Sequence, residues 1–195
     1  MKKVLLLLAN GYEVLEASVF IDVIGWNYID GDKTTKLYTC GVTKEVNTTF
    51  DQKTTVDYTI DEVDFEDYDA LAIPGGFAEY DFYSDGYSEK FLNVIREFDK
   101  RRKIIASICV AALTIGRSGV LRGRNATTYN RKERIRQREL AEYGVKVMDQ
   151  PIVIDDNIIT SYNPSTAFDV AFTLLELLTS KENTDDVKRL MGFIE

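Results

Sequence analysis

The chain has 195 residues, of which 32 are acidic, 24 are basic and none is histidine, so its net charge is −8. This length fits a single core, and we expect one domain over residues 1–195. The acidic balance argues against nucleic-acid binding, no segment approaches the roughly 20 apolar residues of a membrane span, and the lack of histidine excludes Ser-His-Asp and Cys-His catalysis.

Short apolar runs bounded by turn residues recur along the chain, which is typical of strands buried on both faces. We predict strands at Lys3–Ala9, Lys36–Thr39, Ala70–Ile73, Ile104–Ile108, Ile152–Ile154 and Ile158–Thr160. Patterns with helical spacing lie between and after them, at Leu15–Tyr28, Glu89–Lys100, 110–116, Arg131–Tyr143, Thr166–Leu178 and Asp185–Met191. Segment 43–69 is rich in Thr, Val and Asp and indicates short strands or a hairpin at the sheet edge. The alternation predicts an α/β fold, a mostly parallel sheet with helices on both faces.

The chain has two cysteines, Cys40 and Cys109, which lie far apart in the sequence. Nothing in the composition indicates a secreted disulfide scaffold, so we expect free thiols and a cytoplasmic location. The opening MKKVLLLLAN has an apolar run too short for an export signal, and a buried first strand fits it better. With no histidine, the commonest zinc ligand is missing, and we expect neither a metal site nor a cofactor.

Cys109 lies where the buried run KIIASI gives way to a helical pattern. A nucleophile at such a turn needs small residues two positions before and after it, and Ser107 and Ala111 satisfy this requirement. Unpaired N–H groups and the positive end of the helix dipole favour a thiolate there. We therefore expect a reactive Cys109 that is ionised at neutral pH, with a buried inert thiol as the alternative.

Two further features would complete a site around this thiol. Gly75 and Gly76 follow a buried strand, and with the amide of Val110 they would form an oxyanion hole; a plain turn is the alternative. Glu16 lies on the first predicted helix and by itself is an ordinary exposed carboxylate. Placed beside Cys109, it would have a raised pKa, donate a hydrogen bond to sulfur and relay protons.

Four stretches, ANGYEVLEAS, LAIPGGF, ASICVAALTIGRSGVLRGRNATTY and ITSYNPSTAFDVAFTLLELL, resemble the ThiJ/PfpI superfamily in order over roughly residues 3–180. The resemblance implies a three-layer flavodoxin-like sandwich, akin to class I glutamine amidotransferases and usually assembled as a homodimer. It matches Cys109 with the reactive cysteine of the family, Glu16 with its acidic partner, and Gly75 and Gly76 with its glycine pair.

The chain departs from the family pattern at two places. Peptidase-like members have a histidine directly after the cysteine, where this chain has Val110, and deglycase and glyoxalase members have one where the motif ATTY ends at Tyr129. With an unperturbed pKa of about 10, a tyrosine is a poor base. We expect Tyr129 to form an aromatic wall of the site, with a hydrogen-bonding or proton-donating role as the alternative. Asn163 and Pro164 match a pocket-lining loop of the family, in which Asn163 would orient a substrate or serve as a turn residue.

Three functions fit these observations. The first is a cysteine-dependent enzyme in which Cys109 attacks a small aldehyde, ketoaldehyde or similar metabolite while Glu16 shuttles protons. The second is a redox or stress-response protein in which Cys109 is oxidised. The third is a binding module without turnover. Peptidase activity is disfavoured, because release of an amine calls for a nearby acid–base group. We commit to the enzyme, with a small-molecule substrate and no nucleic-acid or membrane partner.

Charge is unevenly distributed along the chain. Segment 117–138 carries eight basic residues against a single acidic one: Arg117, Arg122, Arg124, Arg131, Lys132, Arg134, Arg136 and Arg138 against Glu133. A solvated helix face with its loop explains this pattern. The alternative is a patch that attracts an anionic substrate or an acidic partner.

Overall fold

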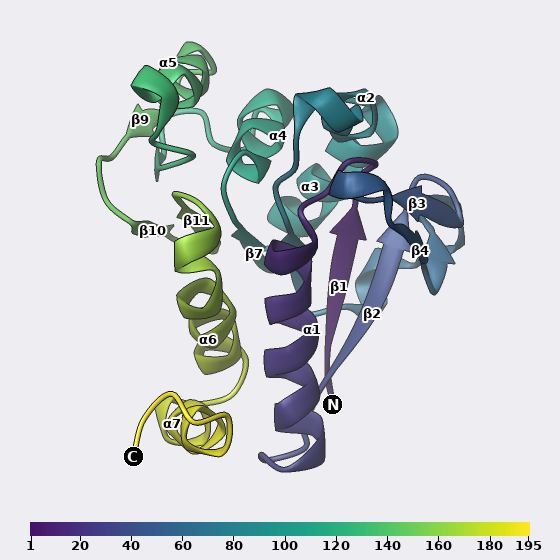
Figure 1. The fold of residues 1–195 in the computed structure, drawn as a ribbon, viewed down its shortest axis with the longest axis vertical. Coiled ribbons are helices and arrows are strands. Elements are labelled where there is room, and N and C mark those ends of the chain that lie inside the picture. Colours follow the sequence, from purple (N-terminus) through teal and green to yellow (C-terminus); the bar gives the residue numbers. More distant parts are fainter.

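The computed structural model describes residues 1–195 and has a seven-stranded sheet between two layers of helices (Figure 1). The strand order is β10-β11-β7-β6-β1-β2-β5. All neighbouring pairs run parallel except β10 and β11, which are antiparallel. The predicted mostly parallel α/β sandwich is confirmed. Its strands are β1 (Lys2–Leu8), β2 (Thr35–Gly41), β5 (Tyr58–Thr59), β6 (Ala70–Ile73), β7 (Ile104–Ser107), β10 (Ile152–Asp155) and β11 (Ile158–Ser161).

The helices form two layers because alternate strand residues point to opposite faces. On one face, α3 (Glu89–Lys100) and α4 (Ala111–Ser118) cover the sheet, and α5 (Ile135–Glu142) packs on α4. On the other face lie α1 (Val14–Ile29) and α6 (Ala167–Leu178), with α7 (Lys181–Leu190) packed against both. A short helix, α2 (Phe82–Gly86), was not predicted. None of these helices is both long and apolar enough to cross a bilayer.

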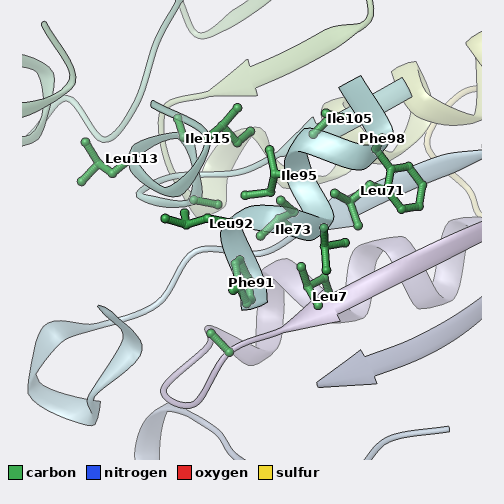
Figure 2. Packing of buried hydrophobic residues seen from close by; sticks show 14 of the residues in the cluster. Leu7, Leu71, Ile73, Phe91, Leu92, Ile95, Phe98, Ile105, Leu113 and Ile115 are labelled. Carbon is green, nitrogen blue, oxygen red and sulfur yellow. The ribbon is translucent and has the colours of Figure 1, made fainter. Parts of the chain in front are cut away.

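Each face of the sheet has its own apolar core. In β1, Leu5 and Leu7 face α3 and α4, whereas Leu6 and Leu8 face α1 and α6. All four leucine side chains are buried. Figure 2 shows the first of these cores, in which side chains of α3 and α4 meet those of β1, β6 and β7. The predicted apolar runs are therefore buried on both faces, as a parallel sheet requires.

Two local differences from the predicted elements have physical causes, and a third concerns a pair of strands that was not predicted. Helix α5 begins at Ile135 instead of Arg131, because residues 132–134 all have left-handed backbone angles. Helix α7 begins at Lys181 instead of Asp185, because Ser180 Oγ accepts a hydrogen bond from the Asn183 N–H (3.1 Å) and caps the helix earlier. The short parallel pair β8 (Asn125–Ala126) and β9 (Lys146–Val147) carries no sequence signal.

Segment 43–69 forms the predicted hairpin and edge strand. The antiparallel pair β3 (Glu45–Asn47) and β4 (Lys53–Thr55) is a separate two-stranded sheet, and β5 then adds to the edge of the main sheet beside β2. The prediction of a hairpin is correct, but only β5 belongs to the sheet edge.

The strand order reverses at β1: β2 and β5 follow on one side of β1, and β6 and the later strands lie on its other side. The loops after β1 and β6 therefore meet at the carboxyl ends of the strands. The Glu13 N–H donates to the Gly75 carbonyl (2.8 Å), and the Phe77 N–H donates to the Gly11 carbonyl (3.1 Å). Ligands in doubly wound sheets bind beside such a reversal, and the site described below lies there.

Candidate active site

Cys109 occupies the turn between β7 and α4 with a φ of +58°. This left-handed conformation costs a residue with a Cβ about 1–2 kcal/mol, so its surroundings must hold it. The Cys109 N–H donates to the Ser161 carbonyl (3.2 Å), and the Cys109 carbonyl accepts from Thr128 Oγ1 (2.8 Å). Ser107 and Ala111, two residues either side, are fully buried. The sequence correctly predicts a strained cysteine turn flanked by small residues.

Glu16 lies in the first turn of α1 and its side chain is completely buried. Its Oε2 accepts a hydrogen bond from the Gly75 N–H (2.7 Å), whereas its Oε1 is buried without a partner. Burial raises the pKa of Glu16 from 4.5 to about 8, although the Gly75 N–H opposes the shift. Glu16 is therefore mostly protonated at pH 7 and has a proton to donate.

The thiol of Cys109 does not have the lowered pKa that its place before a helix predicts. Burial raises the pKa of Cys109 well above its ordinary value, and a charged Glu16 raises it further, whereas the Val110 N–H lowers it. The α4 dipole is thus outweighed by desolvation, and the expectation of a preformed thiolate is wrong. Burial resists a second negative charge beside the first, so at most one of Cys109 and Glu16 is ionised at a time.

The two glycines after β6 have different roles. Because the Gly75 N–H is bound to Glu16, it positions the carboxyl group and does not serve the predicted oxyanion hole. The Gly76 N–H makes no hydrogen bond within the chain, and Gly76 lines the cavity beside Cys109. The Val110 N–H points at the Cys109 sulfur. The amides available near a reacting atom are therefore those of Gly76 and Val110.

A cavity of about 370 Å³ opens over Cys109. Its size is at the lower end of small-molecule sites. Of the residues predicted for the site, Gly75 and Asn163 do not line it. Asn163 serves as a turn residue: its Oδ1 accepts from the Ser165 N–H (3.1 Å), and the next residue, Pro164, reaches the cavity instead. The lining consists of Glu13, Glu16, Gly76, Phe77, Ala78, Glu79, Tyr83, Cys109, Val110, Tyr129, Lys132, Ile135, Arg136 and Pro164.

The sequence and the fold of this chain both match a known family. The sequence profile of the DJ-1/PfpI family matches residues 2–177. The chain belongs to the DJ-1/PfpI family. Among curated relatives, an uncharacterized protein of Methanocaldococcus jannaschii is 33% identical over 115 residues, which are 59% of this chain and 54% of that protein. The protein DJ-1 homolog A of Arabidopsis thaliana is 28% identical over 191 residues, 97% of this chain and 46% of that protein.

This DJ-1/PfpI chain thus spans about half the length of these two relatives. The crystal structure of Drosophila melanogaster DJ-1beta superimposes on it with a TM-score of 0.84 at 25% identity and covers 97% of both chains. The flavodoxin-like sandwich that the resemblance implies is therefore present over almost the whole chain.

Several residues that line the cavity of this DJ-1/PfpI chain carry no signal in its sequence. Tyr83, Ile135 and Arg136 come from segments that no motif singled out as a site, although Arg136 belongs to the basic segment 117–138. Tyr129 is half-buried and lines the cavity, where the expected aromatic wall would place it. No group of three or more Cys, Asp or Glu side chains is arranged to hold a metal ion.

Proposed function

We propose that this DJ-1/PfpI protein is a cysteine-dependent enzyme that acts on small electrophilic metabolites, by hydrolase, hydratase or lyase chemistry on an aldehyde or ketoaldehyde. One observation carries the proposal. The buried Glu16 has one oxygen fixed by the Gly75 N–H and the other without a partner, and it lies with Cys109 in a cavity of about 370 Å³. A carboxyl held this way is suited to moving a proton between sulfur and substrate.

The first chemical step follows from the shared proton. With a pKa of about 8, roughly a tenth of Glu16 is ionised at pH 7 and can accept the thiol proton. The Cys109 sulfur forms a bond to the carbonyl carbon while the π electrons of the C=O bond move to oxygen. Glu16 then gives the same proton to that oxygen, which the Gly76 N–H contacts as charge develops. The product is a neutral thiohemiacetal, and Glu16 is again a carboxylate.

The names of relatives support chemistry of this kind. A protein of Pyrococcus furiosus named a deglycase is 33% identical over 113 residues, which are 58% of this chain and 64% of that protein. Peptidase activity is not proposed, because no histidine is present to protonate an amine leaving group.

Turnover of methylglyoxal tests the proposal. We expect Cys109→Ser and Glu16→Gln each to lower kcat/KM by at least about a hundredfold, the size expected when a nucleophile or a proton relay is removed. Cys40→Ser is the matched control, since Cys40 is buried in β2 and does not line the cavity. Glu16→Gln protein should still be alkylated at Cys109 by iodoacetamide, because its fold and its thiol remain. If both Cys109→Ser and Glu16→Gln turn methylglyoxal over at the wild-type rate, the mechanism is excluded.

A second candidate function is redox sensing through Cys109. The structure described as oxidized Toxoplasma gondii DJ-1 matches this chain with a TM-score of 0.81 at 25% identity. In this reaction two hydrogen peroxide molecules convert the thiol to a sulfinic acid and leave two waters. A protonated Glu16 would donate a hydrogen bond to a sulfinate oxygen. Stoichiometric peroxide uptake without methylglyoxal turnover would favour redox sensing. A protein that shows neither peroxide uptake nor turnover but binds a ligand tightly would be a binding module.

We also propose that the protein forms a homodimer through the outer face of α1. Ile21, Gly25 and Ile29 are spaced four residues apart there and, with Trp26, line a shallow groove. Ile29 is 65% exposed and Trp26 is 40% exposed. Exposed apolar side chains gathered in this way are typical of protein interfaces.

The free thiols of Cys40 and Cys109 are compatible with the proposed cytoplasmic location.

Sedimentation velocity tests this assembly. We expect the wild-type protein to sediment as a dimer and Trp26→Glu to sediment as a monomer, because a buried charge opposes association. Leu177→Glu, at a position of α6 that is 50% exposed and outside the groove, should remain dimeric. A monomeric wild-type protein at micromolar concentration would contradict the proposal.

A further inference from the structure

The cavity over Cys109 has a basic wall. Lys132 and Arg136 line it, and both come from the basic segment 117–138. Lys132 makes no ion pair. Arg136 uses Nη1 to bind Glu139 Oε2 (2.7 Å), and the other N–H groups of its guanidinium have no partner in the chain. The wall therefore has free donors that carry positive charge.

A third donor lies on the same wall. The Tyr83 hydroxyl is buried and has no hydrogen-bond partner, and Tyr83 lines the cavity with Cys109. The Arg136 guanidinium lies over the Tyr83 ring, 5.3 Å from its centroid. A buried hydroxyl without a partner costs about 1–3 kcal/mol, which a bound acceptor would recover. The Tyr83 hydroxyl and the Arg136 N–H groups other than the one bound to Glu139 thus have no acceptor in the chain.

Backbone strain fixes the placement of this wall. Lys132, Glu133 and Arg134 have φ values of 50°, 56° and 58°, and none is a residue that readily adopts left-handed angles. Each such residue costs about 1–2 kcal/mol. The strained turn leads directly into α5, so that Lys132 and Arg136 line the same cavity. Backbone strain of this kind is enriched at functional sites.

Acidic side chains lie on other segments around the cavity. Glu13 follows β1, and its charge raises the pKa of both Glu16 and Cys109, so Glu13 lies on their side of the cavity. Glu79 lies in the turn after the glycine pair. Negative charge on these loops and positive charge on segment 132–136 would orient a substrate with one anionic end. That end would face the basic wall and be repelled from the loops after β1 and β6.

We propose that this cavity selects carbonyl compounds that also carry a carboxylate or phosphate group, held by Arg136, Lys132 and the Tyr83 hydroxyl while the carbonyl carbon faces Cys109. The inference rests on the proposed reactive Cys109 and adds the class of its substrate. An oxo acid is one example, in which an aldehyde or ketone and a carboxylate belong to one small molecule. Arginine suits this role, because its planar fork binds carboxylate and phosphate oxygens.

Two alkylating reagents of the same size isolate the effect of charge. Iodoacetate and iodoacetamide react with Cys109 by the same displacement of iodide, but only iodoacetate is anionic. We expect the ratio of their rate constants, iodoacetate over iodoacetamide, to fall about fivefold to tenfold in Arg136→Gln, since one nearby cation of the cavity is lost. Lys132→Gln should lower the ratio in the same direction. Arg138→Gln is the control, because Arg138 lies on α5 outside the cavity and is exposed.

The outcomes separate this inference from the proposed function. An unchanged iodoacetamide rate in each variant shows that the site remains intact, and Lys132→Gln provides a second test if Arg136→Gln loses its fold. Equal ratios in wild type, Arg136→Gln and Lys132→Gln would overturn the anionic subsite and leave the reactive cysteine in place. A Cys109 that reacts with neither reagent would overturn both. Protection from iodoacetamide by acetate or by inorganic phosphate shows which anionic group the wall prefers.

Discussion

We expect Glu16→Gln to remove a pH dependence of stability that the buried carboxyl gives the wild-type protein between about pH 4.5 and pH 8. The ordinary pKa of this carboxyl is 4.5, and burial raises it to about 8 in the folded protein. Above pH 4.5 the unfolded chain releases the Glu16 proton while the folded chain keeps it. The folded state then binds more protons, so the free energy of unfolding falls as pH rises.

The contribution of Glu16 is fully present below about pH 4.5 and is lost as the pH rises through about 8. Each pKa unit corresponds to about 1.4 kcal/mol, so the shift from 4.5 to about 8 amounts to roughly 5 kcal/mol. Glutamine is neutral at every pH and keeps an oxygen for the Gly75 N–H. We therefore expect wild type and Glu16→Gln to have similar stability near pH 4.5, and the variant to be the more stable near pH 8.

Urea unfolding at pH 5, 6, 7 and 8 measures this difference directly. The other titrating groups are common to both proteins, and Cys109 keeps its proton over this range because burial raises its pKa well above the ordinary value, so their contributions cancel when the two curves are subtracted. Glu182→Gln makes the same chemical change at an exposed position of α7, away from the cavity, and is the matched substitution. If the Glu16→Gln curve runs parallel to wild type, Glu16 is ionised in the folded protein, and the shared-proton mechanism fails with it.

The same buried carboxyl explains why the sequence predicts the place of the site better than its electrostatics. The turn at Cys109 is recognisable because it needs small residues at 107 and 111, and the run before it has the pattern of a buried strand. The pKa of the thiol depends instead on how deeply Cys109 and Glu16 are buried together. The sequence pattern predicts that the helix after Cys109 lowers the pKa of this thiol. In the fold, desolvation is the larger effect and raises that pKa.

The basic wall shows the corresponding limit for the cavity. Excess charge over 117–138 is visible in the sequence, but which side chains reach Cys109 is decided by the left-handed turn at residues 132–134. That turn contains no glycine or asparagine, so no local signal marks it. A helix prediction starting at Arg131 extends the helix through the turn. The strands can be predicted from their own apolar patterns, whereas the basic wall can be located only from the tertiary structure.

Gly75→Ala tests how closely the site is packed, and we expect it to lower the free energy of unfolding by about 2–4 kcal/mol. A Cβ at Gly75 would lie 2.9 Å from Glu16 Oε2, 3.0 Å from the Cys109 Cβ and 3.0 Å from the Ile108 carbonyl oxygen. The last two atoms belong to the strained turn, so Glu16 is the group that can yield. Its displacement breaks the hydrogen bond from the Gly75 N–H and leaves a buried carboxyl without that partner.

A double-mutant cycle separates this effect from a general loss of packing. Glu16→Ala removes both the clashing oxygen and the acceptor, so Gly75→Ala should cost less in that background than in wild type. Gly86→Ala is the control: its Cβ would meet Thr114 at 3.1 Å and does not approach Glu16, so its cost should add to that of Glu16→Ala. If the costs of Gly75→Ala and Glu16→Ala are additive, Gly75 acts through its packing against Ile108 and Cys109 and not through Glu16. Gly75 would then support only the turn at Cys109. Other contacts of α1 would have to hold the Glu16 carboxyl in place.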